Sequence, residues 1–467
     1  MPYKIVLRWA NANHHLLPES EVVSWLMVDG SAMNATAASP GRREFDIANV
    51  PTTVDVHISF TATFDAFSGP NPEQPGQTIN APARALEVLR VDQSYTVVGG
   101  ALVPVANPAY QGPHPLIETD KAASGSGVAV LIIHTTFVDV DALYRAYAGT
   151  HDYYLSHKDP NVDIFALGYT GGTPLLWLAS IPRAARSPSG TRASALVFFR
   201  PASYAYNRIN QPHSSARLLR YLLAPIPTSP NYWEWDFQDP TRYFYIYCGF
   251  DDALLRSNRA MVMLHPRPSG TLYGNAASNM LHSLTAAAMR FLWARRLIYQ
   301  NRGGVTLGRL GISGFSRGGD GLFSALGGSM SKVDEVYLFD CNGSANNSGR
   351  VVQWYDSRDK APGVTGAPRL RMAGGAYNIN LYQSILASIK VLRGKNLVPA
   401  NVTAAPDSDA MYTSGNNPVW EWVIHLRPEL RGFHDSRHQF SVHGGEGSTP
   451  GPQLRTYLLW FLQGSQF

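Results

Sequence analysis

"GISGFSRGGD", Gly311–Asp320, places Ser316 in a Gly-x-Ser-x-Gly pattern. The apolar run "GVTLGRLGI" leads into it, and the helix-like run "GLFSALGG" follows it. With 41 glycines in 467 residues, the pattern occurs by chance in roughly one chain in four, so the flanking sequence has to carry the interpretation. The flanks predict a buried strand, a sharp turn at Ser316 and a helix. Strand and helix approach closely in such a turn, which favours glycine at Gly314 and Gly318.

This strand–turn–helix sequence resembles the nucleophile turn of the α/β-hydrolase superfamily, over roughly residues 130–467. The resemblance implies a mostly parallel sheet covered by helices, with Ser316 as the nucleophile. It also implies that an acid and then a histidine follow the serine along the chain. The histidine would accept the serine proton, and the acid would orient the histidine.

The acid predicted from the sequence is Asp340. In "VDEVYLFDCNG" it directly follows a strand-like run, Val336–Phe339, whereas the next such run, "PRLRMAGGAYN", ends without a carboxylate. Most members of the superfamily carry the acid after the later strand. A minority, including the pancreatic-type lipases, carry it one strand earlier, and this sequence looks like that arrangement. Asp340 could instead only cap the following turn, and Asp407 and Asp409 are then the alternatives.

The base is predicted between the strand-like run "VWEWVIHL" and the terminal helix-like run "QLRTYLLWFLQ". The segment "RGFHDSRHQFSVHGGEG" there contains three histidines, called below the three loop histidines: His434, His438 and His443. His-x-Phe is frequent in the catalytic loop of this superfamily, so His438 is the first choice, His443 the second and His434 the third. Together with Asp435 they could suggest a metal site, but their spacing matches no familiar zinc pattern. We therefore predict neither a metal nor a cofactor.

Two backbone N–H groups should form the oxyanion hole. One is predicted at Arg317, directly after the nucleophile, and the other at Ala202 or Ser203, after the strand-like run "ALVFF". The segment "HPRPSG", beginning at His265, is the rival for the second donor. Residues 204–247 are dense in aromatic side chains, which either pack an interface or line a pocket for an apolar or aromatic group of an ester substrate.

The first 105 residues have a different pattern of apolar and polar residues. In "VDVHISFTATF", Val54–Phe64, apolar and polar residues alternate with the period of two that is typical of a half-buried strand. This pattern predicts an antiparallel β-sandwich domain over residues 1–105. A Pro-, Gly- and Ser-rich stretch predicts a linker at 106–127, and strands alternating with helices predict an α/β-hydrolase domain at 128–467 with the aromatic-rich insertion near 204–247.

Composition excludes several classes of protein. An apolar fraction of 45% and a charged fraction of 16% do not fit a disordered chain, and no apolar run reaches the length of an integral membrane segment. The net charge of +5 is dispersed, so nucleic acid is not predicted as a partner. Lys4 and Arg8 interrupt the apolar start of the chain, so no signal peptide is visible. This predicts a cytoplasmic protein or a secreted one whose leader was removed.

The function predicted from these observations is that of a serine hydrolase cleaving carboxylic esters, an esterase or lipase with a polyester or an acylated polymer among its candidate substrates. An amidase or acyltransferase would use the same triad. From a different class, a non-catalytic binding protein on a hydrolase scaffold is the alternative. The oligomeric state stays open.

Overall fold

The structure is a computed structural model of the 467-residue chain. It describes residues 2–9, 22–64, 67–70, 78–110, 112–120, 127–142, 161–172, 174–186, 192–199, 250–266, 273–299, 304–315, 318–339, 341, 343–359, 369–374, 380–382, 384–385, 387–388, 410–413, 420–424, 458–459, 461–465 and 467. These residues form two five-stranded sheets, a two-stranded sheet and a ten-stranded sheet.

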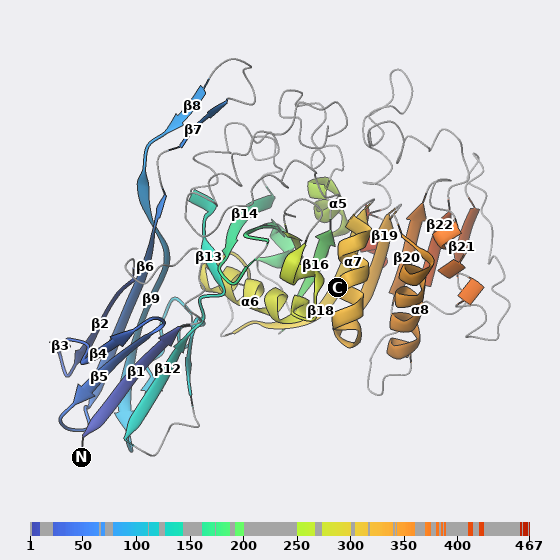
Figure 1. Ribbon diagram of the computed structural model, residues 1–467. Helices are drawn as coiled ribbons and strands as arrows, with labels where there is room; N and C mark the ends of the chain where they lie inside the picture. Colours follow the sequence, from blue (N-terminus) through green and yellow to red (C-terminus); the bar gives the residue numbers. More distant parts are fainter. Residues whose placement is uncertain are drawn as a thin grey trace.

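The two five-stranded sheets come from the amino-terminal part of the chain (Figure 1). The first has the strand order β11 (Ile117–Thr119), β12 (Val128–Ile133), β1 (Tyr3–Trp9), β5 (Arg42–Ile47) and β4 (Ala37–Ser39). The second has the order β10 (Ala101–Pro104), β9 (Arg84–Val98), β6 (Thr53–Phe64), β2 (Val22–Val28) and β3 (Ser31–Met33). The hairpin of β6 and β9 continues into β7 (Phe67–Pro70) and β8 (Thr78–Ala81), which Figure 1 shows projecting beyond both sheets.

Alternating residues of β6 are buried between these sheets, as the period of two predicts. Val54, Val56, Ile58 and Phe60 are each at most 2% exposed. The ring of Phe60 meets the ring of Trp9, on the other sheet, edge-on with centroids 5.7 Å apart. The inner faces of the two sheets therefore contact each other through apolar side chains.

The strand Val128–Ile133 lies in a different sheet from the one that the sequence predicts. We expect it to open the hydrolase sheet, but β12 pairs in parallel with β1 along its whole length. Its residues alternate between half-buried and buried, as suits a sheet with one exposed face. Because all six are apolar, the sequence does not reveal this alternation. The chain enters the ten-stranded sheet only at β13 (Phe137–Asp139).

The segment predicted as a linker, residues 106–127, makes specific contacts in its described part. The Tyr110 hydroxyl donates to the Ala294 carbonyl at 2.9 Å. The backbone N–H of His114 donates to Gln93 Oε1 at 2.6 Å, and the rings of Tyr110 and His114 meet with centroids 4.9 Å apart. This segment therefore contacts both β9, through Gln93, and the last residue of helix α6, Ala294.

The ten-stranded sheet contains the strands on which the predicted site depends. Its order is β13 (Phe137–Asp139), β14 (Val162–Tyr169), β15 (Leu176–Pro182), β17 (Met261–Pro266), β16 (Arg192–Phe199), β18 (Thr306–Phe315), β19 (Glu335–Phe339), β20 (Arg369–Gly374), β22 (Trp420–Ile424) and β21 (Ala410–Thr413). All neighbours from β17 to β22 pair in parallel. The sheet is mixed, because β13, β15 and β21 run antiparallel to their neighbours.

β14 and β15 differ from the prediction of parallel strands separated by helices. They form an antiparallel hairpin, and only residues 170–175 lie between them. A parallel pair needs a crossover of about a dozen residues or more, so this connection is too short for one. Both strands are almost fully buried, and that is why their composition resembles that of parallel strands.

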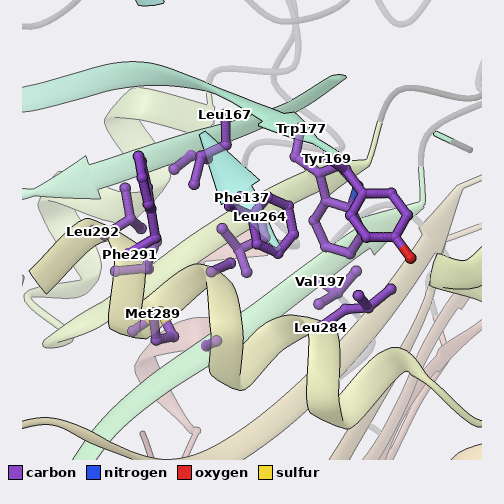
Figure 2. Close-up of a cluster of buried hydrophobic side chains, with 14 of the residues drawn as sticks. Phe137, Leu167, Tyr169, Trp177, Val197, Leu264, Leu284, Met289, Phe291 and Leu292 are labelled. Carbon is purple, nitrogen blue, oxygen red and sulfur yellow. The ribbon is translucent and has the colours of Figure 1, made fainter. Parts of the chain in front are cut away.

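Helices cover both faces of this sheet. They are α5 (Phe250–Ser257), α6 (Leu281–Ala294), α7 (Gly318–Ser329) and α8 (Ala345–Asp359), with short 3-10 helices at η3 (Arg183–Ala185), η7 (Gly274–Ala277) and η8 (Met330–Lys332). α7 and α8 pack side by side (Figure 1). Figure 2 shows Leu284, Met289, Phe291 and Leu292 of α6 gathered with apolar side chains of β13–β17. Among the described residues, no helix is long and apolar enough to cross a membrane.

Candidate active site

The carboxyl ends of three parallel strands meet at one edge of the ten-stranded sheet. Gly314 of β18 is in register with Phe199, the last residue of β16. On the other side, the last residue of β18, Phe315, is in register with Phe339, the last residue of β19. The segments that follow β16, β18 and β19 therefore begin side by side.

This edge contains a topological switch point. After β16 the chain passes through α5 to β17, which lies on one side of β16, and then through α6 to β18, which lies on the other side. In open α/β sheets, ligands bind in the crevice outside the carboxyl ends of the strands where the order reverses in this way. The order of the strands alone places a candidate site between the ends of β16 and β18.

β18 and α7 follow each other closely in the sequence. β18 ends at Phe315 and α7 begins at Gly318, so only two residues separate the strand from the helix. A Cβ atom on Gly314 would lie 3.1 Å from the Gly318 carbonyl oxygen and 3.2 Å from Leu322 Cβ. The close approach of strand and helix thus explains why glycine occupies position 314.

A second close contact holds α7 against the end of β16. A Cβ on Gly321 would lie 2.7 Å from Phe199 Cδ1 and 2.6 Å from Tyr273 Cδ2. The rings of Phe199 and Tyr273 also meet edge-on with centroids 5.1 Å apart. The amino-terminal part of α7 therefore packs closely against the end of β16, at the switch point.

The backbone around the end of β19 is tied to β18 by a buried cysteine. Cys341 is 0% exposed; its thiol donates to the Gly314 carbonyl oxygen at 3.0 Å, and its N–H donates to the Tyr382 hydroxyl oxygen at 2.7 Å. Below the strand ends, the ring of Phe339 stacks on the ring of Phe461 with centroids 5.0 Å apart.

Most of the predicted site residues lie outside the described residues. They are Ser316, Arg317, Asp340, Ala202, Ser203, Asp407, Asp409 and the three loop histidines. The aromatic-rich stretch 204–247 also lies outside them. What the structure does describe is the set of strand ends and helices from which these residues follow.

His265, the rival for the second oxyanion donor, is described. It belongs to β17 and is 1% exposed, with its Nε2 3.4 Å from Ser180 Oγ and its ring 5.9 Å from that of Phe198. Its side chain is therefore part of the packed sheet, and any donor from this segment would have to come from the residues after Pro266.

The strand order separates the two candidate positions for the acid. Asp340 follows β19, the direct neighbour of β18, whereas Asp409 precedes β21. Ala410, the first residue of β21, pairs with Ile424, the last residue of β22, so this end of β21 lies at the same edge of the sheet. At a spacing of about 4.8 Å between strands, β19 is about 5 Å from β18 and β21 is about 19 Å away.

Tyr382 belongs to this region although no sequence pattern predicts it. It lies 41 residues after Cys341, in a segment where no local pattern points to the sheet edge. The one available signal is the cysteine directly after the predicted acid, which composition alone interprets as a small buried residue. Among the described residues, no group of three or more His, Cys, Asp or Glu side chains could hold a metal ion.

No family model matches the chain, and no curated protein matches it. Solved structures similar to it include the siderophore hydrolase EstB from Aspergillus nidulans, at 12% identity over 66% of this chain and 97% of that one, with a TM-score of 0.33. A feruloyl esterase module from Clostridium thermocellum has 13% identity over 67% and 91%, with a TM-score of 0.34. FphF, a fluorophosphonate-binding serine hydrolase from Staphylococcus aureus, has 12% identity over 64% and 98%, with a TM-score of 0.31.

Proposed function

We propose that this protein is a serine hydrolase that cleaves carboxylic esters, built on an α/β-hydrolase fold. The observation that carries the proposal is the position of Gly-Phe-Ser-Arg-Gly. Its described residues are Gly314 and Phe315, which end β18, and Gly318, which begins α7, beside the topological switch point of the sheet. A ligand bound at that switch point would lie next to Ser316, and a serine in such a turn exposes its hydroxyl at the top of the sheet.

In the proposed mechanism, Ser316 Oγ attacks the ester carbonyl and a histidine accepts its proton. The histidine is proposed to be His438, with His443 and then His434 as alternatives, all of which follow β22 in the sequence. Asp340 orients the imidazole and stabilises its charged form. The alcohol leaves with the proton returned by the histidine, and water activated by the same histidine then releases the acid from the acyl-enzyme.

Two backbone N–H groups would stabilise the oxyanion of the tetrahedral intermediate. Arg317 supplies one because it directly follows the nucleophile. Ala202 or Ser203 supplies the other because both follow β16, the strand that adjoins β18 at the switch point. β17 is separated from β18 by β16, which favours this choice over the segment after β17.

The substrate is proposed to carry an apolar or aromatic group. The aromatic-rich residues 204–247 follow β16 in the sequence, and the last residue of β16, Phe199, is in register with Gly314, two residues before Ser316. Aromatic side chains near a reactive serine favour apolar acyl or alcohol groups. A polyester or an acylated polymer would fit a protein with a separate amino-terminal β-sandwich domain that takes no part in the chemistry. Amide hydrolysis or acyl transfer would use the same residues.

A second candidate function, binding without catalysis, is favoured by one surface of the amino-terminal sheets. Trp25 of β2 is 39% exposed, and its ring stacks on the ring of His57 with centroids 4.7 Å apart and planes at 13°. Tryptophan is enriched at protein interfaces, so an exposed tryptophan ring on a sheet face is suited to contact with a partner or a ligand. Labelling of a single serine by a fluorophosphonate would favour the hydrolase over this alternative.

The test is hydrolysis of nitrophenyl esters of increasing chain length by the wild type, Ser316→Ala and Ser313→Ala. Ser313 is a matched control on the same strand, 0% exposed and with no hydrogen-bond partner among the described residues. We expect Ser316→Ala to lower turnover by about 10⁶ and to lose fluorophosphonate labelling at an unchanged melting temperature. Ser313→Ala should keep both. Activity of Ser316→Ala within tenfold of the wild type would refute the assignment.

A further inference from the structure

Two hydrogen bonds of Cys341 connect the segments on which the proposed nucleophile and acid lie. The thiol donates to the carbonyl of Gly314, two residues before Ser316. The backbone N–H, which belongs to the peptide bond joining Cys341 to Asp340, donates to the Tyr382 hydroxyl oxygen. The buried Cys341 thus contacts β18, the strand that precedes Ser316. Its backbone N–H, directly after Asp340, is held by the Tyr382 hydroxyl.

The surroundings of these two bonds are densely packed. Cys341 and Tyr382 are both 0% exposed. A Cβ on Gly343 would lie 2.9 Å from Leu381 Cδ2 and 3.0 Å from Phe323 Cε2. Leu381, next to Tyr382, and Phe323 of α7 therefore both lie close to the chain just after Cys341. Water has little access to replace a lost hydrogen bond in such a region.

We infer that Cys341 and Tyr382 are positioning residues, which hold the acid segment after β19 in register with the nucleophile turn after β18. The inference rests on the proposed function and adds two residues to it. A peptide plane has few degrees of freedom, so fixing the Cys341 N–H restricts the direction in which the side chain of the preceding residue can leave the backbone. The thiol–carbonyl bond then fixes this peptide relative to β18.

Neither residue has a role in substrate binding in this arrangement, so the two kinetic constants should respond differently. Loss of the Tyr382 hydroxyl should lower kcat and leave KM nearly unchanged, because the imidazole is oriented less well. A displacement of about 1 Å can lower a rate by about 100-fold, so a loss of about 10- to 100-fold is expected. The low-pH limb of kcat/KM should also move to lower pH, because a less well placed carboxylate favours the charged histidine less.

The experiment compares Tyr382→Phe, Cys341→Ala and Cys341→Ser with a matched control, Tyr299→Phe. Tyr299 is also buried, and its hydroxyl donates to the Ala260 carbonyl at 3.1 Å, but Ala260 precedes β17 at the opposite edge of the sheet. Tyr382→Phe and Cys341→Ala should show the loss in kcat and the shifted pH limb. Cys341→Ser keeps a donor and should recover most of the activity. Tyr299→Phe should keep both kcat and the pH profile.

The inference is overturned if Tyr382→Phe and Cys341→Ala are folded and keep kcat within about twofold, or if Tyr299→Phe lowers kcat and shifts the pH limb equally. Should Tyr382→Phe fail to fold, the comparison of Cys341→Ala with Cys341→Ser decides. Fluorophosphonate labelling distinguishes this failure from failure of the proposed function. A wild type that is labelled at Ser316 while the positioning variants behave as wild type leaves the hydrolase intact. A wild type without labelling or hydrolysis removes both.

Discussion

Replacing Gly314 by alanine should separate β18 from α7 and damage both stability and turnover. The added methyl group would lie 3.1 Å from the Gly318 carbonyl oxygen, 3.2 Å from Leu322 Cβ and 3.3 Å from Cys341 Sγ. Relaxed contacts between carbon atoms are about 3.5–4.0 Å, so these neighbours must each move by several tenths of an ångström. Backbone and buried side chains cannot do so independently. Overpacking of this kind costs about 1–3 kcal/mol of the free energy of unfolding.

The measurement is urea-induced unfolding together with turnover of a nitrophenyl ester. Gly349→Ala in α8 is the control, because a Cβ there meets nothing within 4 Å. It should raise the free energy of unfolding by about 0.5–1 kcal/mol, since alanine is favoured over glycine inside a helix. Gly314→Ala should also lower turnover by about tenfold, because the displaced turn carries the proposed nucleophile. Stability of Gly314→Ala within about 0.5 kcal/mol of the wild type, with full turnover, would refute the reasoning.

Three further predictions concern charged groups. Asp340→Asn should lower turnover by about 10³–10⁴, because the histidine would then adopt the wrong tautomer. Asp409→Asn should keep turnover within tenfold of the wild type. If Asp409→Asn were the more damaging change, the acid would lie beside β21 and not beside β19. Single alanine substitutions of the three loop histidines should give one nearly inactive enzyme, at His438, and two active ones in the same ester assay. Burial lowers the pKa of His114 from 6.5 to about 4, so between these values the unfolded chain binds the proton and the folded one does not. Stability should therefore fall by up to about 3 kcal/mol as pH drops through that window. Urea midpoints at pH 7 and 4.5 check this, and His114→Gln should lose less stability than the wild type.

Local sequence patterns predicted the elements around the candidate site well. The strand before Ser316, the helix after it and the strand before Asp340 correspond to β18, α7 and β19. Each follows from burial along a short segment, which periodicity records directly. Gly314 is explained in the same way, because a two-residue reversal brings backbone to backbone wherever it occurs. These features depend on neighbours that are close in sequence.

The partners of the strands could not be predicted in the same way. β12 joins β1, and β14 forms a hairpin with β15, yet their apolar runs look like those of the parallel strands. The composition of a strand indicates that the strand is buried, but it does not indicate which strand pairs with it. The link from Cys341 to Tyr382 spans 41 residues, and no pattern in either segment indicates the other.

The sequence by itself therefore determined which strand and helix flank Ser316 and which strand precedes Asp340, because sterics and hydrophobic periodicity act over a few residues. Only the tertiary structure decided that β16, β18 and β19 end side by side at a switch point, and that Cys341 and Tyr382 tie two of those ends together. Strand order and register depend on side-chain packing and backbone pairing summed over the whole sheet. Those interactions join residues far apart in the chain, and they come into existence only when the sheet has formed.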